Sequence, residues 1–198
     1  MHEFGRRSLL SLVVAAALAL AAGPAYAAGA EAFVKERHAE LVDLLGKDGD
    51  SNERKVEAVF DAMLDYDTLA KGSLGAYWDE RTDAERAEFK ELLKRLVQRA
   101  YRKNLKKTLD YDVDYQGETQ AKDGQLVKTV AKNKRNKREE PLSVDYLLHR
   151  IGGKWKVFDI VTAGSSLLDN YRNQFRRIIK KYDYQELIRR MKRKADED

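Results

Sequence analysis

Three aspartates at alternate positions are the first residues whose type and spacing could bind a cation. Asp110, Asp112 and Asp114 lie in a stretch where they alternate with Tyr111 and Val113. In a strand, residues two apart share one face and lie about 7 Å from each other. A calcium loop of the Asp-x-Asp-x-Asp-Gly type would need a glycine that is missing here. We therefore predict a solvated strand face and no metal site.

A possible nucleophile follows later in the chain. Gly164-Ser165-Ser166 comes after a predicted strand and before a predicted helix, as the serine of a nucleophile elbow does. The stretch lacks the second glycine of that motif, and no histidine is placed to act as its base. His38 and His149 are both expected to be surface residues. We therefore interpret the serines as caps of the following helix.

Asp159 is the only candidate for a general base. It is an acidic residue on an otherwise apolar predicted strand. It could act in an enclosed cavity, pair with an arginine, or hydrogen-bond the turn at Gly164. No matching acid is visible in the sequence, so we predict that the protein is not an enzyme and needs no cofactor.

The composition sets limits on the compartment and the partners. The chain has 198 residues with a formal net charge of +5, and 36% of its residues are charged. It contains no cysteine, which excludes disulfides, thiolate catalysis, cysteine-bound metals and a lipid-modified N-terminal cysteine. A basic surface suits anionic lipid, nucleic acid or an acidic partner, and charge alone does not choose among them.

The N-terminus predicts export from the cytoplasm. Arg6-Arg7 precedes an apolar run from Leu9 to Ala22, and Ala25-Tyr26-Ala27 forms a small-x-small cleavage site. These features are typical of a secretory signal peptide over residues 1–27, cleaved after Ala27. The alternative is a membrane anchor, but the run is shorter than the roughly 20 residues that span a bilayer. The arginine pair leaves Sec and twin-arginine export both open.

Hydrophobic periodicity predicts helices first, then strands, then helices again. Strands are expected over 110–115, 125–132, 142–149 and 154–162, with short turns that favour an antiparallel meander. Helices are expected over 30–45, 52–64, 68–74, 82–108 and 167–181, and from 184 onward. The fold class is therefore α+β, with helices packed on a curved four-stranded antiparallel sheet, as in a cystatin-like or nuclear-transport-factor-like roll. We assign 28–194 to one domain and 195–198 to a charged tail.

The stretch from Lys154 to Phe175 is central to the predicted fold, because it contains a strand, a turn and a helix in succession. Its first half alternates as a strand, with Trp155, Val157 and Val161 expected on one face. Phe158 and Ile160 are expected on the opposite face, so both sides of the strand should be covered.

Basic residues form two groups, in the connection 132–138 and in the helices over 172–194. They either form a solvated surface or dock the protein transiently to anionic headgroups or to an acidic partner. Nucleic acid is not expected, because no basic strand is interleaved with aromatic residues.

The sequence resembles a known family along nearly all of the exported chain. The stretch WKVFDIVTAGSSLLDNYRNQF closely resembles the signature of the Mla-pathway periplasmic phospholipid-binding proteins, the MlaC or toluene-tolerance family. Further matches run in the family's order, at 55–78, at 85–105 and at 144–146. Three departures are Glu85 in place of glutamine, the long basic connection 132–140, and the pair Thr162-Ala163.

The resemblance implies a carrier function. Such proteins move diacyl phospholipids through the periplasm of Gram-negative bacteria, between an outer-membrane lipoprotein complex and an inner-membrane ABC transporter, and so maintain outer-membrane lipid asymmetry. The protein would be a monomer. Two exposed tails of about 16 carbons each cost roughly 25 kcal/mol, so the resemblance implies a deep apolar cavity with the headgroup left near solvent.

Candidate wall residues of such a cavity are chosen by inner-face phase and motif match. They are Leu69, Leu74, Trp78, Phe89, Leu93, Leu105, Val130, Val144, Tyr146, Leu148, Val161, Leu167 and Tyr171. Three alternatives stay open: a different lipid such as a hopanoid, a roll-fold enzyme using Asp159, and an adaptor whose core is filled. Periodicity does not distinguish a filled roll from a hollow one.

Overall fold

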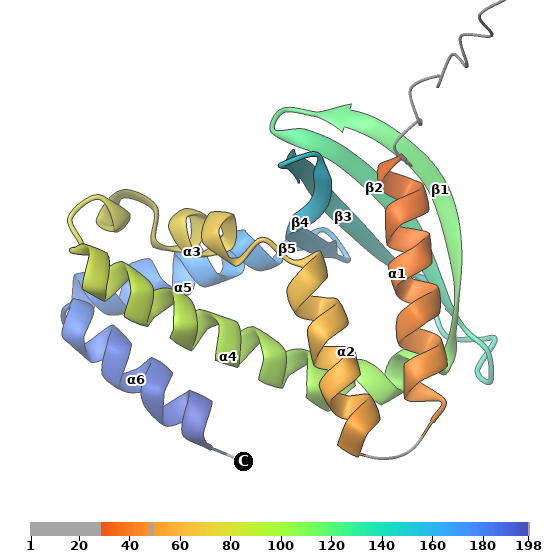
Figure 1. Ribbon diagram of the computed structural model, residues 1–198, viewed down its shortest axis with the longest axis horizontal. Coiled ribbons are helices and arrows are strands. Elements are labelled where there is room, and N and C mark those ends of the chain that lie inside the picture. Colours follow the sequence, from red (N-terminus) through yellow and green to blue (C-terminus); the bar gives the residue numbers. More distant parts are fainter. Residues whose placement is uncertain (1–28, 48–49, 198) are drawn as a thin grey trace, which may run out of the picture.

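The computed structural model describes residues 29–47 and 50–197, so the predicted signal peptide lies outside the described residues (Figure 1). The helices are α1 (Ala30–Leu45), α2 (Asp50–Met63), α3 (Tyr66–Leu74), α4 (Asp83–Thr108), α5 (Leu167–Lys181) and α6 (Tyr184–Asp196), and a short 3₁₀ helix, η1 (Gly75–Trp78), follows α3. The strands are β1 (Tyr111–Ala121), β2 (Gly124–Asn133), β3 (Leu142–Ile151), β4 (Lys154–Thr162) and β5 (Ser165–Ser166). The predicted α+β order is confirmed.

The sheet has five strands, and the prediction of four was wrong. Its order is β1-β2-β3-β4-β5, and every neighbouring pair is antiparallel. The extra strand is the serine pair, which turns back to pair with Val161 and Thr162. Ala163 and Gly164 make this turn with positive φ values of 48° and 76°. The stretch that we expected to be only a turn and a cap is therefore also an edge strand.

Local signals place several helix ends where the sequence predicts them. At the start of α4 the Thr82 backbone N–H donates to the Glu85 carboxylate (2.9 Å), and the Glu85 N–H donates to the Thr82 hydroxyl (3.2 Å). This reciprocal pair is the predicted capping box. Ser166 caps α5 by accepting from the Asp169 N–H. In contrast, α2 begins at Asp50, before position 52 where we expected this helix to start, and α6 continues to Asp196 and includes half of the predicted tail.

A β-bulge changes which side chains of β4 face inward. Leu148 pairs with Val157 and Leu147 pairs with Asp159, so Phe158 is the extra residue of the bulge. Beyond the bulge, Tyr146 pairs with Ile160. Because one extra residue shifts the alternation of a strand, Ile160 lies on the same face as Val157, and Val161 does not. The predicted grouping of Val161 with Val157 is therefore wrong.

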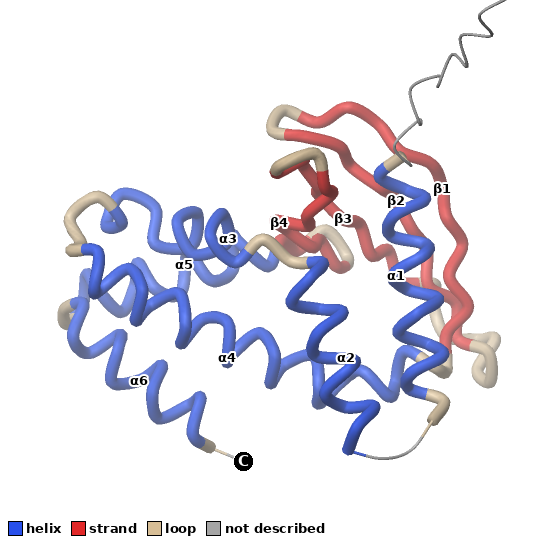
Figure 2. Tube along the Cα trace, viewed as in Figure 1, coloured by secondary structure: helices blue, strands red, loops and turns tan. Residues whose placement is uncertain are grey.

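The helices form two groups around the sheet (Figure 2). The sheet curves around α1, which lies beside β1 and β2, and α2 packs against α1. The helices α3, α4, α5 and α6 pack on one another next to the sheet, and α4 extends from this group to beneath α1 and α2. Among the described helices, none is both long enough and apolar enough to cross a bilayer.

One hydrophobic core connects the helical group to the sheet. Its fully buried side chains include Phe89 and Leu93 of α4, Leu187 of α6, and Val127 and Leu148 of the sheet. A smaller cluster of Leu41, Val56 and Val59 joins α1 to α2. The sheet and the long helix are thus held by one core, to which α1 and α2 contribute Ala30, Val34 and Met63, and the smaller cluster adds packing between α1 and α2.

Leu93 provides a test of this core. Its side chain has no exposed surface, so Leu93→Ala should lower the free energy of unfolding by about 2–5 kcal/mol through lost burial and a cavity. Urea unfolding followed by circular dichroism measures this change. Ile151→Ala is the control, because Ile151 is 49% exposed and its truncation should cost under about 1 kcal/mol. Equal losses in the two variants would contradict the assignment of Leu93 to the core.

Candidate functional site

An apolar pocket lies between the inner face of the sheet and the helices α1, α2 and α4. Its volume is about 310 Å³. The residues that line it are Val34, His38, Leu41, Phe60, Met63, Leu64, Lys107, Thr108, Tyr111, Val113, Thr129, Ala131, Leu142, Val144, Tyr146 and Ile160. Most are aliphatic or aromatic, as is typical of small-molecule sites.

The polar residues of the pocket indicate where it opens. Lys107 and Thr108, at the end of α4, are exposed, whereas Thr129 on the floor is 1% exposed. The Thr129 hydroxyl donates to the Val144 carbonyl, so it presents no unsatisfied donor to the pocket. The pocket therefore has an apolar interior and a solvent-facing end beside a cationic side chain.

The expectation that His38 is a surface residue was wrong. His38 is half-buried in the pocket wall, and its Nδ1 lies 2.9 Å from the hydroxyl of Tyr115. Burial lowers the pKa of His38, and the positive charge of Lys134 lowers it further. The imidazole is therefore neutral at pH 7 and keeps the wall uncharged. Burial also raises the pKa of Tyr146 to about 12, so the phenol is neutral as well.

His149 does not line this pocket and has a structural role, and because it too is half-buried, the expectation of a surface residue was wrong for it as well. Its Nε2 lies 2.7 Å from the carboxylate of Asp65, which is 5% exposed and caps α3 by accepting from the N–H groups of Asp67 and Thr68. Burial acts to raise the pKa of Asp65, but the hydrogen bonds from Thr68 and His149 outweigh it, and the net pKa is lowered. The His149–Asp65 interaction connects β3 to the N-terminus of α3.

Asp159 also serves structure. One carboxylate oxygen accepts from the Leu168 N–H (3.0 Å) and the Ile160 N–H (2.8 Å), and the other accepts from the Ser166 hydroxyl (2.6 Å). The residue is 8% exposed and does not line the apolar pocket. It hydrogen-bonds the turn into α5, which is one of the roles that we left open.

The three alternating aspartates pair with the basic connection that follows β2. Lys132 lies 2.5 Å from Asp114, Lys134 lies 3.7 Å from Asp112, and Arg135 lies 3.3 Å from Asp110. Within the described ranges, no group of three or more histidine, cysteine or acidic residues could hold a metal ion. The aspartates thus balance part of the charge of the connection.

The structure places few of the predicted wall residues in the pocket. Val144 and Tyr146 line it. Five belong to the main core instead, namely Leu69, Leu74, Phe89, Leu93 and Leu148. Trp78 is half-buried against that core, Leu167 is half-buried at the start of α5, and Tyr171 lines a different pocket. The side chain of Leu105 lies outside the described residues.

Val130 and Val161 lie on the wrong face for the pocket. On β2 the buried positions are Val127, Thr129 and Ala131, so the intervening Val130 points away. On β4 the bulge brings Ile160 into the pocket wall in place of Val161.

Sequence reasoning missed most of the lining from the helices. The apolar stripes of α1 and α2 supply Val34, Leu41, Phe60 and Met63, and Leu64 directly follows α2. Their helical spacing was visible in the sequence, but it does not say whether a stripe faces a pocket or a filled core.

Comparison with known proteins identifies the family. The family model described as MlaC protein matches residues 36–193, which is most of the chain. The chain belongs to the MlaC family. The resemblance seen in the sequence is thereby confirmed. A direct sequence comparison with curated proteins finds no match.

A solved structure shares the fold of this MlaC-family chain. It is the phospholipid-binding protein from Ralstonia solanacearum in complex with a phospholipid, with 24% sequence identity and a TM-score of 0.69. The similarity covers 85% of this chain and 97% of the other. At this identity the likeness establishes a common architecture.

The neutral state of His38 predicts a pH dependence of stability. Because its pKa is lower in the folded protein than in the unfolded chain, the unfolded chain binds the proton first. Stability should be full above about pH 6.5 and should fall as the pH drops below that value. His38→Gln removes this contribution and should flatten the decline in the unfolding midpoint between pH 7.5 and pH 5.

A second variant separates the two causes of this effect. Lys134→Met removes the neighbouring charge while burial stays, so its decline should lie between those of the wild type and His38→Gln. An unchanged decline in His38→Gln would show that other groups control stability in this range.

Proposed function

We propose that this protein is a periplasmic phospholipid carrier, and that its apolar pocket receives acyl chains of the cargo. The observation that supports this most strongly is the pocket itself: a largely aliphatic and aromatic lining that opens to solvent beside Lys107 and Thr108. Membership of the MlaC family and the fold shared with a phospholipid-binding protein support the same assignment.

The energetics favour burial of the tails over recognition of the headgroup. Each methylene removed from water contributes about 0.8 kcal/mol, whereas a hydrogen bond to a charged headgroup contributes about 1.5–3 kcal/mol. A carrier with this lining should therefore hold lipids mainly by their chains and discriminate weakly among headgroups. The solvent-facing end of the pocket, where Lys107 is exposed, suits an anionic headgroup.

The pocket must widen to take two full tails. A cavity of about 150 Å³ holds one benzene molecule, so a volume of about 310 Å³ holds about a dozen carbons. The ends of α1 and α2 that carry Leu41, Val56 and Val59 are the part of the wall best suited to move, because these residues form a cluster separate from the main core, whereas Val34 and Met63 of the same helices belong to that core. We propose that these ends shift away from the sheet when lipid enters.

The carrier role includes partners and a compartment. The predicted signal peptide directs the chain to the periplasm, where it would exchange lipid with an inner-membrane ABC transporter and an outer-membrane lipoprotein complex, and so maintain outer-membrane lipid asymmetry. Transient contact with membrane surfaces is part of this proposal. Exposed cations of α5, such as Arg176, Arg177 and Lys180, suit such contact.

Neighbouring residues of β2 allow a matched test of the pocket. Ala131 lines the pocket, so Ala131→Phe should fill part of it and reduce the phospholipid that copurifies with the protein. Val130 points to the opposite face, so Val130→Phe adds a similar ring outside the pocket and should leave the lipid content unchanged. Native mass spectrometry after purification from cells, followed by organic extraction, measures the bound lipid.

The outcomes of this test are distinct. Loss of lipid in Val130→Phe with retention in Ala131→Phe would place the cargo elsewhere and contradict the proposal. A wild-type protein that binds no phospholipid, either copurified or added, would indicate an adaptor. An extracted polycyclic lipid would indicate a hopanoid-type cargo. Circular dichroism confirms that both variants are folded.

A further inference from the structure

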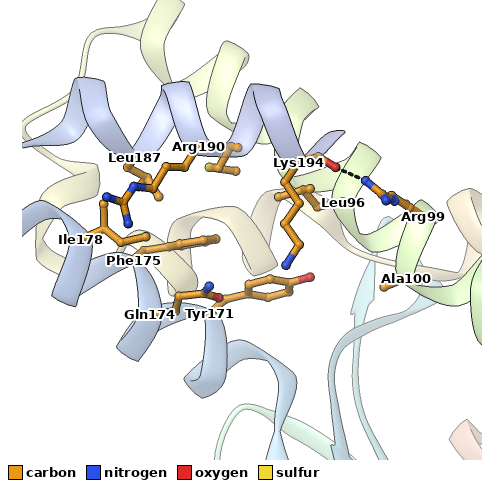
Figure 3. Close-up of a pocket in the computed structure, with 11 residues that line it drawn as sticks. Leu96, Arg99, Ala100, Tyr171, Gln174, Phe175, Ile178, Leu187, Arg190 and Lys194 are labelled. Carbon is orange, nitrogen blue, oxygen red and sulfur yellow. Dashed lines mark hydrogen bonds between the residues drawn. The ribbon is translucent and has the colours of Figure 1, made fainter. Parts of the chain in front are cut away.

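A second pocket lies on another side of α4, between this helix and α5 and α6 (Figure 3). Its volume is about 300 Å³, and it shares no lining residue with the pocket under the sheet. It is lined by Leu96, Arg99 and Ala100 of α4, by Tyr171, Gln174, Phe175 and Ile178 of α5, and by Leu187, Arg190, Met191 and Lys194 of α6.

The floor of this second pocket is apolar and rigid. Phe175 and Met191 are each 3% exposed, and Leu187 is fully buried. The Phe175 ring packs edge-on against Phe89 at 5.5 Å and stacks on Tyr171 at 5.3 Å. Because these rings are fixed by the main core, the floor offers a preformed surface for an aliphatic chain.

The rim of the pocket is cationic and contains no acidic residue. Two of its cations are engaged elsewhere: Arg99 donates to the Lys194 carbonyl, and Arg190 pairs with Glu186 at 2.8 Å. Lys194 differs, since no carboxylate in the described part of the chain pairs with its ammonium group. Its side chain is exposed and extends over the pocket toward Tyr171 (Figure 3).

A phenol and an amide lie beside this ammonium group. The hydroxyl of Tyr171 has no hydrogen-bond partner among residues 29–47 and 50–197, although its side chain is largely buried in the pocket wall. Burial raises the pKa of Tyr171, so the phenol remains a neutral donor at physiological pH. Gln174 follows one turn later on α5 and lines the same pocket. Ammonium, phenol and amide together present donors that suit a compact anion.

We propose that this second pocket binds a single-chain anionic amphiphile of the fatty-acid class. The carboxylate would accept hydrogen bonds from Lys194 and Tyr171, and the chain would lie over Phe175 and Met191. A volume of about 300 Å³ holds about a dozen carbons, which matches one medium-length chain and not a diacyl lipid. This inference is independent of the phospholipid carrier proposal, because the two pockets have no residue in common.

Laurate, a twelve-carbon fatty acid, is the probe for this site. Isothermal titration calorimetry with the mature protein should show saturable binding of one equivalent. Lys194→Met keeps the aliphatic stem but removes the charge, and it should weaken binding about tenfold, as expected when one charge-assisted hydrogen bond is lost. Lys180→Met is the matched control: Lys180 is an exposed lysine of α5 outside the pocket, so its loss should leave affinity unchanged.

Two blocking variants locate the ligand. Ala100 is exposed at the edge of the second pocket, so Ala100→Trp should obstruct it with little effect on folding, and laurate binding should be lost. Ala131→Phe obstructs the pocket under the sheet and should leave laurate binding intact. Lys194→Met and Ala100→Trp should both retain copurified phospholipid.

Three results would overturn the inference. The first is an absence of saturable laurate binding. The second is equal weakening by Lys180→Met and Lys194→Met, which would indicate nonspecific charge attraction. The third is loss of binding in Ala131→Phe with retention in Ala100→Trp, which would place laurate in the phospholipid pocket. None of these results bears on whether the protein carries phospholipid.

Discussion

Asp159 joins the sheet to the helical group through hydrogen bonds at the start of α5. Its carboxylate accepts from the backbone N–H of Leu168 and from the hydroxyl of Ser166, and the Ser166 hydroxyl in turn accepts from the N–H of Asp169. A buried carboxylate is stable only when it is hydrogen-bonded in this way. The position of α5, and with it of Phe175 and Tyr171, depends on this junction.

The bulge in β4 allows Asp159 to hydrogen-bond the start of α5 while its neighbour Ile160 lines the apolar pocket. By placing Phe158 as an extra residue, it directs Asp159 toward α5 while Ile160 faces the pocket beside Tyr146. A regular strand would place Asp159 on the same face as Val157, among the core residues. One irregularity in strand register therefore separates the polar structural contact from the apolar site, and bulges commonly re-aim side chains in this manner.

The long helix α4 separates two pockets of different character. The pocket under the sheet has a mostly apolar interior that includes a half-buried His38 whose pKa is lowered, and it suits acyl chains. The pocket among the helices has an apolar floor and a rim with Lys194, and it suits a chain that ends in an anion. Both contact the same helix, but the wall of the first includes α1 and α2, which are joined by a small second cluster in addition to the main core.

The sequence by itself determined the family, the α+β class, the order of the elements and most helix ends. These features depend on local signals, such as the Thr82–Glu85 capping box and the change of period from 3.6 to 2 near Tyr111, which neighbouring residues specify.

Only the tertiary structure decided which apolar residues line a pocket and which fill the core. Val130 and Val161 were assigned to the wrong face, because the inner face of a strand depends on strand register and on a bulge that periodicity does not show. Leu93 and Phe89 were assigned to the pocket, because a helical stripe looks the same whether it meets a cavity or other side chains. His38 and Asp159 took their roles from partners that are distant in sequence or that meet only in the folded turn. Local sequence patterns specify helices and strands, but a binding site depends on contacts between residues that are distant in sequence. The apolar pocket exists because α1 and α2 pack against the sheet.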